Sequence, residues 1–135
     1  MNIAIYGRPV NLNQIELAET LVKLLIQSGH RVVLHSDYYV FLKQHLPLEP
    51  KMPVFTSHEE ISSDIDFLFS IGGDGTLLDT VSLVKDSKIP VVGVNAGRLG
   101  FLSSVSRENL EFAIDSLAKG HYSTDARTLL RVESN

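Results

Sequence analysis

Short apolar runs alternate with stretches of helical periodicity along most of this chain, and this alternation limits the folds that it can adopt. Runs apolar enough for buried strands occupy residues 2–6, 31–35, 66–71 and 89–94. Between and after them, apolar side chains recur on one helical face in residues 14–28, 76–84 and 107–119. Buried strands separated by helices predict an α/β fold, with a Rossmann-like, mainly parallel sheet and helices on both faces.

Local residues refine these boundaries. Asp37 is expected to cap a helix that runs to about Leu46, and residues 54–55 form a weak candidate strand. Ser106 is expected to cap the helix over 107–119. Gly29 and Gly120 suit the positions that follow helix ends, because glycine accepts a positive φ there.

The chain is expected to comprise one domain and a short C-terminal stretch. We predict an N-terminal α/β domain over residues 1–121. Residues 122–135 contain an apolar, extended run at Leu129–Glu133, which is either an edge strand of this small domain or the first strand or linker of a second domain.

Composition excludes several classes of protein. The 135 residues carry a net charge of −4 and no long basic run, so nucleic acid is not an expected partner. The absence of cysteine excludes disulfides and thiolate metal sites. No apolar segment reaches the roughly 18 residues needed to cross a bilayer, so no membrane association and a cytoplasmic location are expected. The five histidines show no metal-ligand spacing.

The strand at 66–71 runs directly into a glycine-rich turn, which the next helix follows. The turn consists of Gly72, Gly73, Asp74, Gly75 and Thr76. Its glycines allow backbone amides to approach a ligand without Cβ obstruction, and the N-terminus of a helix favours phosphate. Thr76 either caps that helix or touches a phosphate oxygen, with capping slightly favoured. Asp74 is the best catalytic candidate, because a carboxylate beside phosphate must bind a cation or accept a proton.

A structural role is the alternative for this turn. Asp-Gly pairs are common in turns without any function, so position after a strand raises the expectation of phosphate binding without proving it. The turn by itself leaves phosphate binding and a plain turn about equally supported.

A second glycine-rich loop follows the strand at 89–94. Asn95, Gly97 and Arg98 are candidates to complete a nucleotide cradle, since the glycine permits close backbone approach and the guanidinium is a planar cation. Phe101 and Leu102 could contact an adenine ring, although the pattern alone favours a place in the core.

Together the two loops resemble the NAD kinase family. Gly-Gly-Asp-Gly-Thr at 72–76, followed by Val-Asn-Ala-Gly-Arg-Leu-Gly-Phe-Leu at 94–102, is more specific than either motif alone. The first motif also occurs in diacylglycerol and sphingosine kinases and, more distantly, in 6-phosphofructokinases. The segment from Asn95 to Leu102 selects NAD kinase, and the likeness extends to Arg127–Leu130.

The resemblance implies phosphorylation of the adenosine ribose 2′-hydroxyl of NAD, giving NADP. The donor is ATP or polyphosphate, with Mg²⁺ or another divalent cation. Asp74 matches the general base and also contacts NAD, Gly75 lies beside the NAD ribose, and Phe101 and Leu102 match positions that contact NAD. The implied phosphate or ATP contacts are Gly72, Gly73, Gly75, Thr76, Asn95, Gly97 and Arg98, and no residue is assigned as a metal ligand.

The resemblance also implies that residues 1–121 form a nucleotide-phosphate-binding domain and that residues 122–135 are the first strand or linker of a second, β-rich domain, most of which this chain lacks. The family has, in its second domain, an Asn followed by an acidic residue that helps to hold the NAD ribose, and no such pair follows Arg131 here. Residues 1–135 alone are therefore expected to be inactive, whereas the full-length protein is expected to form a homo-oligomer. The other hypotheses are a lipid or sugar kinase domain that shares Gly-Gly-Asp-Gly, and a non-catalytic nucleotide-binding module.

Overall fold

A single parallel sheet organises the chain. The computed structural model describes residues 1–9, 12–61, 63–95 and 105–124. The strands are β1 (Asn2–Gly7), β2 (Arg31–His35), β3 (Val54–Phe55), β4 (Phe67–Ile71), β5 (Val91–Asn95) and β6 (Val105–Ser106). They lie in the order β3-β2-β1-β4-β5-β6, and every neighbouring pair is parallel. The predicted α/β fold with a mainly parallel sheet is confirmed.

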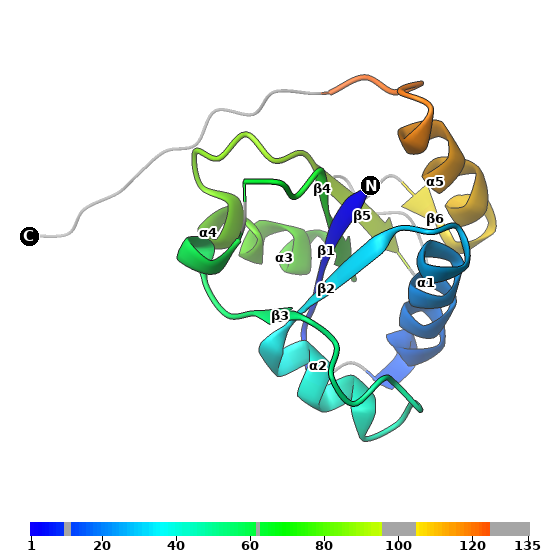
Figure 1. The fold of residues 1–135 in the computed structure, drawn as a ribbon, viewed down its shortest axis with the longest axis vertical. Helices are drawn as coiled ribbons and strands as arrows, with labels where there is room; N and C mark the ends of the chain where they lie inside the picture. The colour runs from blue at the N-terminus through cyan, green and yellow to red at the C-terminus, as the bar shows by residue number, and fades with distance from the viewer. Residues whose placement is uncertain (10–11, 62, 96–104, 125–135) are drawn as a thin grey trace, which may run out of the picture.

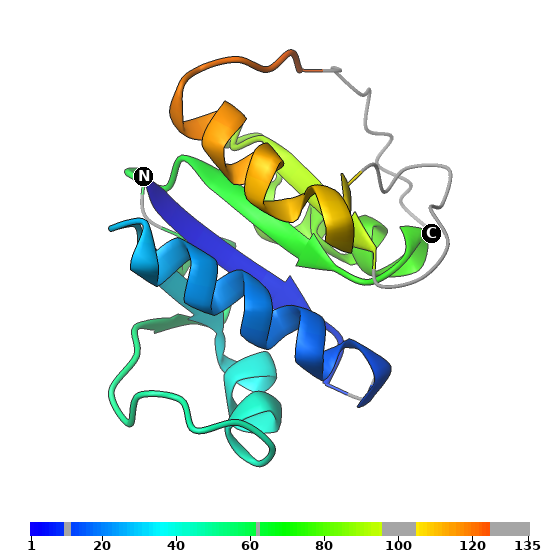
Figure 2. The same ribbon diagram turned by 90° about the vertical axis from the view of Figure 1, so that its right-hand side faces the viewer.

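Helices cover both faces of this sheet (Figure 1). They are α1 (Ile15–Gln27), α2 (Ser36–Lys43), α3 (Asp74–Asp79), α4 (Val81–Val84) and α5 (Leu110–Ala118), with short 3-10 helices at Leu12–Gln14, His58–Glu60 and Arg107–Asn109. Figure 2 shows α1 and α5 crossing one face, while α3 and α4 lie on the other. None of the helices in the described ranges is long and apolar enough to span a membrane.

Alternate residues of the strands point to opposite faces of the sheet and pack in two apolar clusters. On the α1 face, Ile3, Ile5 and Phe69 pack with Leu21 and Leu25 of α1. On the opposite face, Ala4, Val33 and Leu68 pack with Leu83 of α4. Because successive strand residues point to opposite faces and both faces are covered, the central strands are apolar at nearly every position, as the sequence predicted, with Ser70 a buried exception in β4.

The strand order reverses between β1 and β4. From β1 the chain proceeds through β2 to β3, then returns to place β4 on the other side of β1. Tyr6 pairs with Ser70 and Gly7 with Ile71, so β1 and β4 end at the same edge of the sheet. In open α/β sheets, ligands bind outside the carboxyl ends of the strands where the order reverses. This edge is therefore where a ligand site is expected.

Several predicted boundaries are wrong in detail. The helix expected from Asp37 to Leu46 begins at Ser36 and ends at Lys43, so Asp37 lies within its first turn and is not the cap. The helix expected over 107–119 opens with a 3-10 turn, and the Ser106 side chain makes no capping hydrogen bond. Gly29 and Gly120 do have positive φ, at +81° and +74°. Leu129–Glu133 lies outside the described residues.

Candidate functional site

The turn after β4 is shaped by Gly72. This residue has a φ of +152°, a conformation that side chains of L-residues rarely adopt, and it is buried. Its N–H donates a 2.9 Å hydrogen bond to the carbonyl oxygen of Val94 in β5. A β-carbon on residue 72 would stand 2.5 Å from Oγ1 of Thr76, which leaves no room for a side chain. The turn is thus tethered to the neighbouring strand and needs glycine at this position.

The next residue, Gly73, is open to a ligand. A β-carbon there would meet no atom within 4 Å, and the residue is half-exposed. It occupies the cap position of α3, which begins at Asp74. The open side of this turn therefore lies at Gly73 and Asp74, where the backbone can be approached from solvent.

Two expectations about the helix after the turn are corrected. The helix begins at Asp74 instead of Thr76, so Thr76 is not its cap; it lies buried in the first turn with only 6% of its surface exposed. The expected single helix over 76–84 is divided into α3 and α4, which meet at Thr80. With only six residues, α3 provides a smaller dipole than a long helix would.

The sheet brings one residue of the second loop to the same edge. Asn95, the last residue of β5, is half-buried and follows Val94, whose carbonyl oxygen accepts the Gly72 hydrogen bond. The other candidates of that loop are Gly97, Arg98, Phe101 and Leu102, and these lie outside the described residues.

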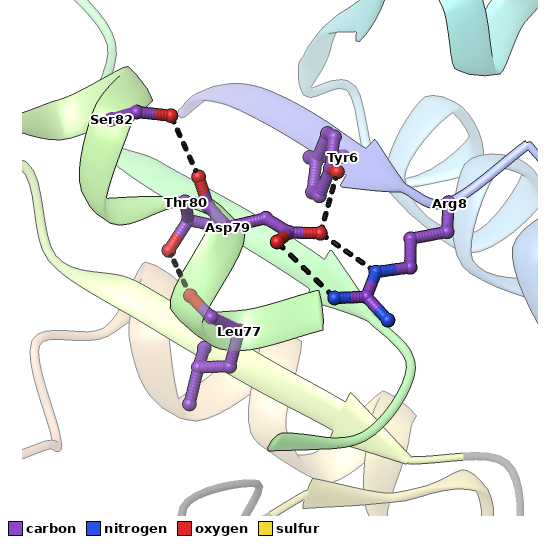
Figure 3. Close-up of polar contacts among 6 residues, drawn as sticks. All are labelled: Tyr6, Arg8, Leu77, Asp79, Thr80 and Ser82. Atoms are coloured by element: carbon purple, nitrogen blue, oxygen red, sulfur yellow. Dashed lines mark hydrogen bonds and ion pairs between the residues drawn. The ribbon is translucent and has the colours of Figure 1, made fainter. Parts of the chain in front are cut away.

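Three residues that the sequence did not single out form a polar cluster beside the turn (Figure 3). Arg8, just after β1, donates from Nε to Oδ2 of Asp79 at 2.8 Å and from Nη2 to Oδ1 at 3.2 Å. The Tyr6 hydroxyl donates to the same Oδ2 at 2.9 Å. Asp79 is the last residue of α3, so the cluster fastens this helix to the end of β1.

The charge states of this cluster are fixed by its own contacts. Hydrogen bonding from Arg8 lowers the pKa of Asp79, despite its partial desolvation. Burial, followed by the contact with Asp79, raises the pKa of Tyr6 to about 12. The Asp79 contact also raises the pKa of Arg8. At neutral pH the cluster therefore consists of a carboxylate, a neutral phenol and a guanidinium cation.

Arg8 also reaches the glycine turn. The three atoms nearest to a β-carbon built on Gly75 are all from its guanidinium, with Nη2 at 3.2 Å and Nη1 at 3.4 Å. The sequence offered one signal for Arg8: a glycine, Gly7, stands at the end of the first strand, much as Gly72 stands directly after β4. It could not show that these two strand ends are neighbours, because the strand order is set by the fold.

A group of three or more metal-ligating side chains does not occur among the described residues. Asp74 is half-buried on the open side of the turn. A single carboxylate suits a Mg²⁺ ion that is held mainly by substrate phosphates and water, which is the common arrangement in phosphoryl-transfer enzymes.

Comparison with known proteins identifies the family to which this chain is similar. The family model described as the ATP-NAD kinase N-terminal domain matches residues 3–122. An NAD kinase of Christiangramia forsetii is 32% identical over the whole chain, and one of Bacteroides fragilis is 36% identical over 98% of it. The chain spans about half the length of these relatives, 46% and 45% respectively.

Solved structures share the fold. A yeast NADH kinase complexed with NADH superimposes with a TM-score of 0.71 and 24% identity, covering 90% of this chain and 38% of that one. An NAD kinase from Archaeoglobus fulgidus in complex with ATP gives a TM-score of 0.51 and 24% identity, covering 89% of this chain and 38% of that one. Since the N-terminal domain model matches most of its length, the chain belongs to the NAD kinase family.

Proposed function

We propose that this chain forms the nucleotide-phosphate-binding part of an enzyme that phosphorylates NAD. The enzyme transfers the γ-phosphate of ATP, or a terminal phosphate of polyphosphate, to the 2′-hydroxyl of the adenosine ribose, giving NADP. The position of Asp74 carries the proposal: it lies on the open side of a glycine turn, at the sheet edge where the strand order reverses. Membership of the NAD kinase family supports the same reaction.

In this proposal Asp74 is the general base. It accepts the proton of the ribose hydroxyl as the oxygen attacks the γ-phosphorus, and the bond from phosphorus to the leaving diphosphate breaks. A carboxylate whose ordinary pKa is about 4 is a weak base for an alcohol, so positioning and charge stabilisation provide most of the rate enhancement. Mg²⁺ or another divalent cation, when bound, neutralises charge on the phosphates.

The remaining contacts are proposed because the chain belongs to the NAD kinase family. Gly75 borders the NAD ribose, and Phe101 and Leu102 contact NAD. The phosphate contacts come from Gly72, Gly73, Gly75, Thr76, Asn95, Gly97 and Arg98. For Thr76, which is buried within α3, the contact would have to come from its backbone or follow a local rearrangement.

The test measures NADP formation by the protein translated from the complete reading frame that contains residues 1–135. Replacing the carboxylate by Asp74→Asn should lower kcat by about a hundredfold to ten-thousandfold, the usual contribution of a general base, with little change in KM. Asp86→Asn is the matched control, because Asp86 is an exposed carboxylate in the segment after α4. Equal rates for wild type and Asp74→Asn would contradict the proposed base.

The same assay separates the wider alternatives. Diacylglycerol and fructose 6-phosphate, offered in place of NAD, test for a lipid or sugar kinase, and nucleotide binding without turnover would indicate a non-catalytic module. Residues 1–135 alone should give no turnover. The proposed cytoplasmic location and homo-oligomeric assembly are tested by cell fractionation and by light scattering of the purified protein.

A further inference from the structure

We propose that Arg8 binds a phosphate group of a nucleotide at the Gly72–Thr76 turn, and that Asp79 and Tyr6 are positioning residues that hold its guanidinium there. This inference rests on the proposed function, because it assigns a further ligand contact to the same site. Arg8 follows β1, whereas the glycine turn follows β4, so the two parts of the proposed site come from different strands.

The fold places Arg8 at the site. Gly7 pairs with Ile71, so the residues that follow β1 and β4 emerge side by side where the strand order reverses. Arg8 lies directly after Gly7, and its Nη2 stands 3.2 Å from a β-carbon built on Gly75. The exposed backbone of Gly75 is thus flanked by a cation, which any larger residue at position 75 would crowd.

The Asp79 contacts orient the Arg8 guanidinium and leave some of its N–H donors for a ligand. Arginine has five N–H bonds in a planar fork, and the Asp79 contacts use the one on Nε and one on Nη2. The others are on Nη1 and Nη2, the two nitrogens closest to Gly75. Half of the Arg8 side chain, 48%, remains exposed to solvent, so an anion can reach it. A planar pair of donors matches the spacing of phosphate oxygens.

The contacts behind Arg8 account for its orientation. Asp79 is held from a second side by the Tyr6 hydroxyl, and Tyr6 in turn packs edge-on against the buried His35 ring, at 5.2 Å between ring centroids. This chain of contacts connects the guanidinium to the sheet. An ion pair that served only to fasten α3 to β1 would not require the free end of the guanidinium to cover Gly75.

The test is calorimetric titration of the protein from the complete reading frame with ATP and Mg²⁺, and separately with NAD. Arg8→Gln should weaken binding of one nucleotide by about tenfold, the usual effect of losing a charge-assisted hydrogen bond. A loss confined to ATP identifies a donor phosphate as the ligand, and a loss confined to NAD identifies its diphosphate. Arg8→Lys should retain part of the affinity, because it keeps the charge but not the fork.

Arg31→Gln is the matched control. Arg31 is also exposed and paired with a carboxylate, Asp64 at 3.6 Å, but it lies at the amino end of β2, away from the glycine turn. Unchanged affinity of Arg8→Gln for both nucleotides, or an equal loss in Arg31→Gln, would overturn the inference.

The positioning residues have their own readout. Asp79→Ala keeps Arg8 but removes the two hydrogen bonds that orient its guanidinium. It should therefore weaken binding of the same nucleotide as Arg8→Gln does, but by a smaller factor. If Asp79→Ala lowered thermal stability but left that affinity unchanged, the positioning role would be wrong.

Failure of this inference differs from failure of the proposed function. If the wild-type protein binds ATP or NAD but forms no NADP, the proposed reaction fails while the Arg8 contact is still measured. If NADP forms and Arg8→Gln binds both nucleotides normally, the proposed reaction stands and the Arg8 contact fails.

Discussion

Thr76 lies so close to Gly72 that a β-carbon on residue 72 would stand 2.5 Å from the threonine Oγ1. Thr76 is buried within α3 and cannot easily retreat. Gly72 also has a φ of +152°, which favours glycine independently of the contact. Two separate constraints therefore require glycine at the first position of the turn.

Gly72→Ala should be strongly destabilising. The contact with Thr76 and the unfavourable φ together are expected to cost about 2–4 kcal/mol of unfolding free energy, a sum of overpacking and backbone strain. Urea unfolding followed by circular dichroism measures this loss. Gly73→Ala is the control, because its β-carbon would meet nothing within 4 Å, and its stability should stay within about 0.5 kcal/mol of wild type. Equal stabilities of the two variants would show that the turn adapts.

Replacement of Ser70 should not harm stability. Its hydroxyl is buried in β4 and has no hydrogen-bond partner among the described residues, so the desolvation of that oxygen is uncompensated. Ser70→Ala should leave the protein equally stable or more stable by about 1 kcal/mol. Thr80→Val is the contrasting variant, since Oγ1 of the buried Thr80 donates to the Leu77 carbonyl at 2.6 Å and its loss should cost about 1 kcal/mol. Thermal unfolding of both variants tests the difference, and a clear loss in Ser70→Ala would contradict the expectation.

The burial of Tyr6 and its contact with Asp79 should make stability fall in alkali. The pKa of Tyr6 is about 12 in the folded protein, against an ordinary value of 10.0. Because the folded state holds the phenol proton more tightly, its contribution is complete below pH 10 and is lost as the pH rises through about 12. Urea unfolding across this window should show a smaller loss in Tyr6→Phe than in wild type.

Tyr122→Phe serves as the control for that experiment. Tyr122 is 48% exposed and lies beyond α5, where its ring contacts that of Phe67 at the start of β4. Its replacement should leave the wild-type dependence on pH in place. If Tyr6→Phe and wild type lost stability in parallel, the raised pKa of Tyr6 in the folded protein would be wrong.

The helix after the turn should tolerate changes at Leu78 but not at Leu83. The apolar spacing predicted one helix over residues 76–84, with its apolar side chains on one face. The two short helices instead leave Leu78 59% exposed and bury Leu83, which is 7% exposed. Leu83→Ala should cost about 2–4 kcal/mol of unfolding free energy and Leu78→Ala less than about 0.5 kcal/mol. Comparable losses would contradict the observed packing.

The segment of α3 and α4 shows what the apolar pattern could not predict. Periodicity identified a helical stretch but not the division at Thr80, where the threonine hydroxyl bonds back to the Leu77 carbonyl. The cap assigned to Thr76 was wrong for a related reason. Whether a hydroxyl caps a helix or is buried within it depends on where the helix begins, and α3 begins at Asp74, two residues earlier than expected.

Features that depend on neighbouring residues could be predicted from the chain alone. Apolar runs became buried parallel strands, Gly29 and Gly120 followed helix ends, and Gly72 to Thr76 formed a strand-to-helix turn, because each depends on local burial or backbone freedom. The contact of Arg8 with Asp79, 71 residues away and beside Gly75, could not be predicted in this way, because it depends on the assembled fold. That meeting follows from the placement of β4 against β1, which is fixed by the packing of the whole sheet and not by any segment of the chain.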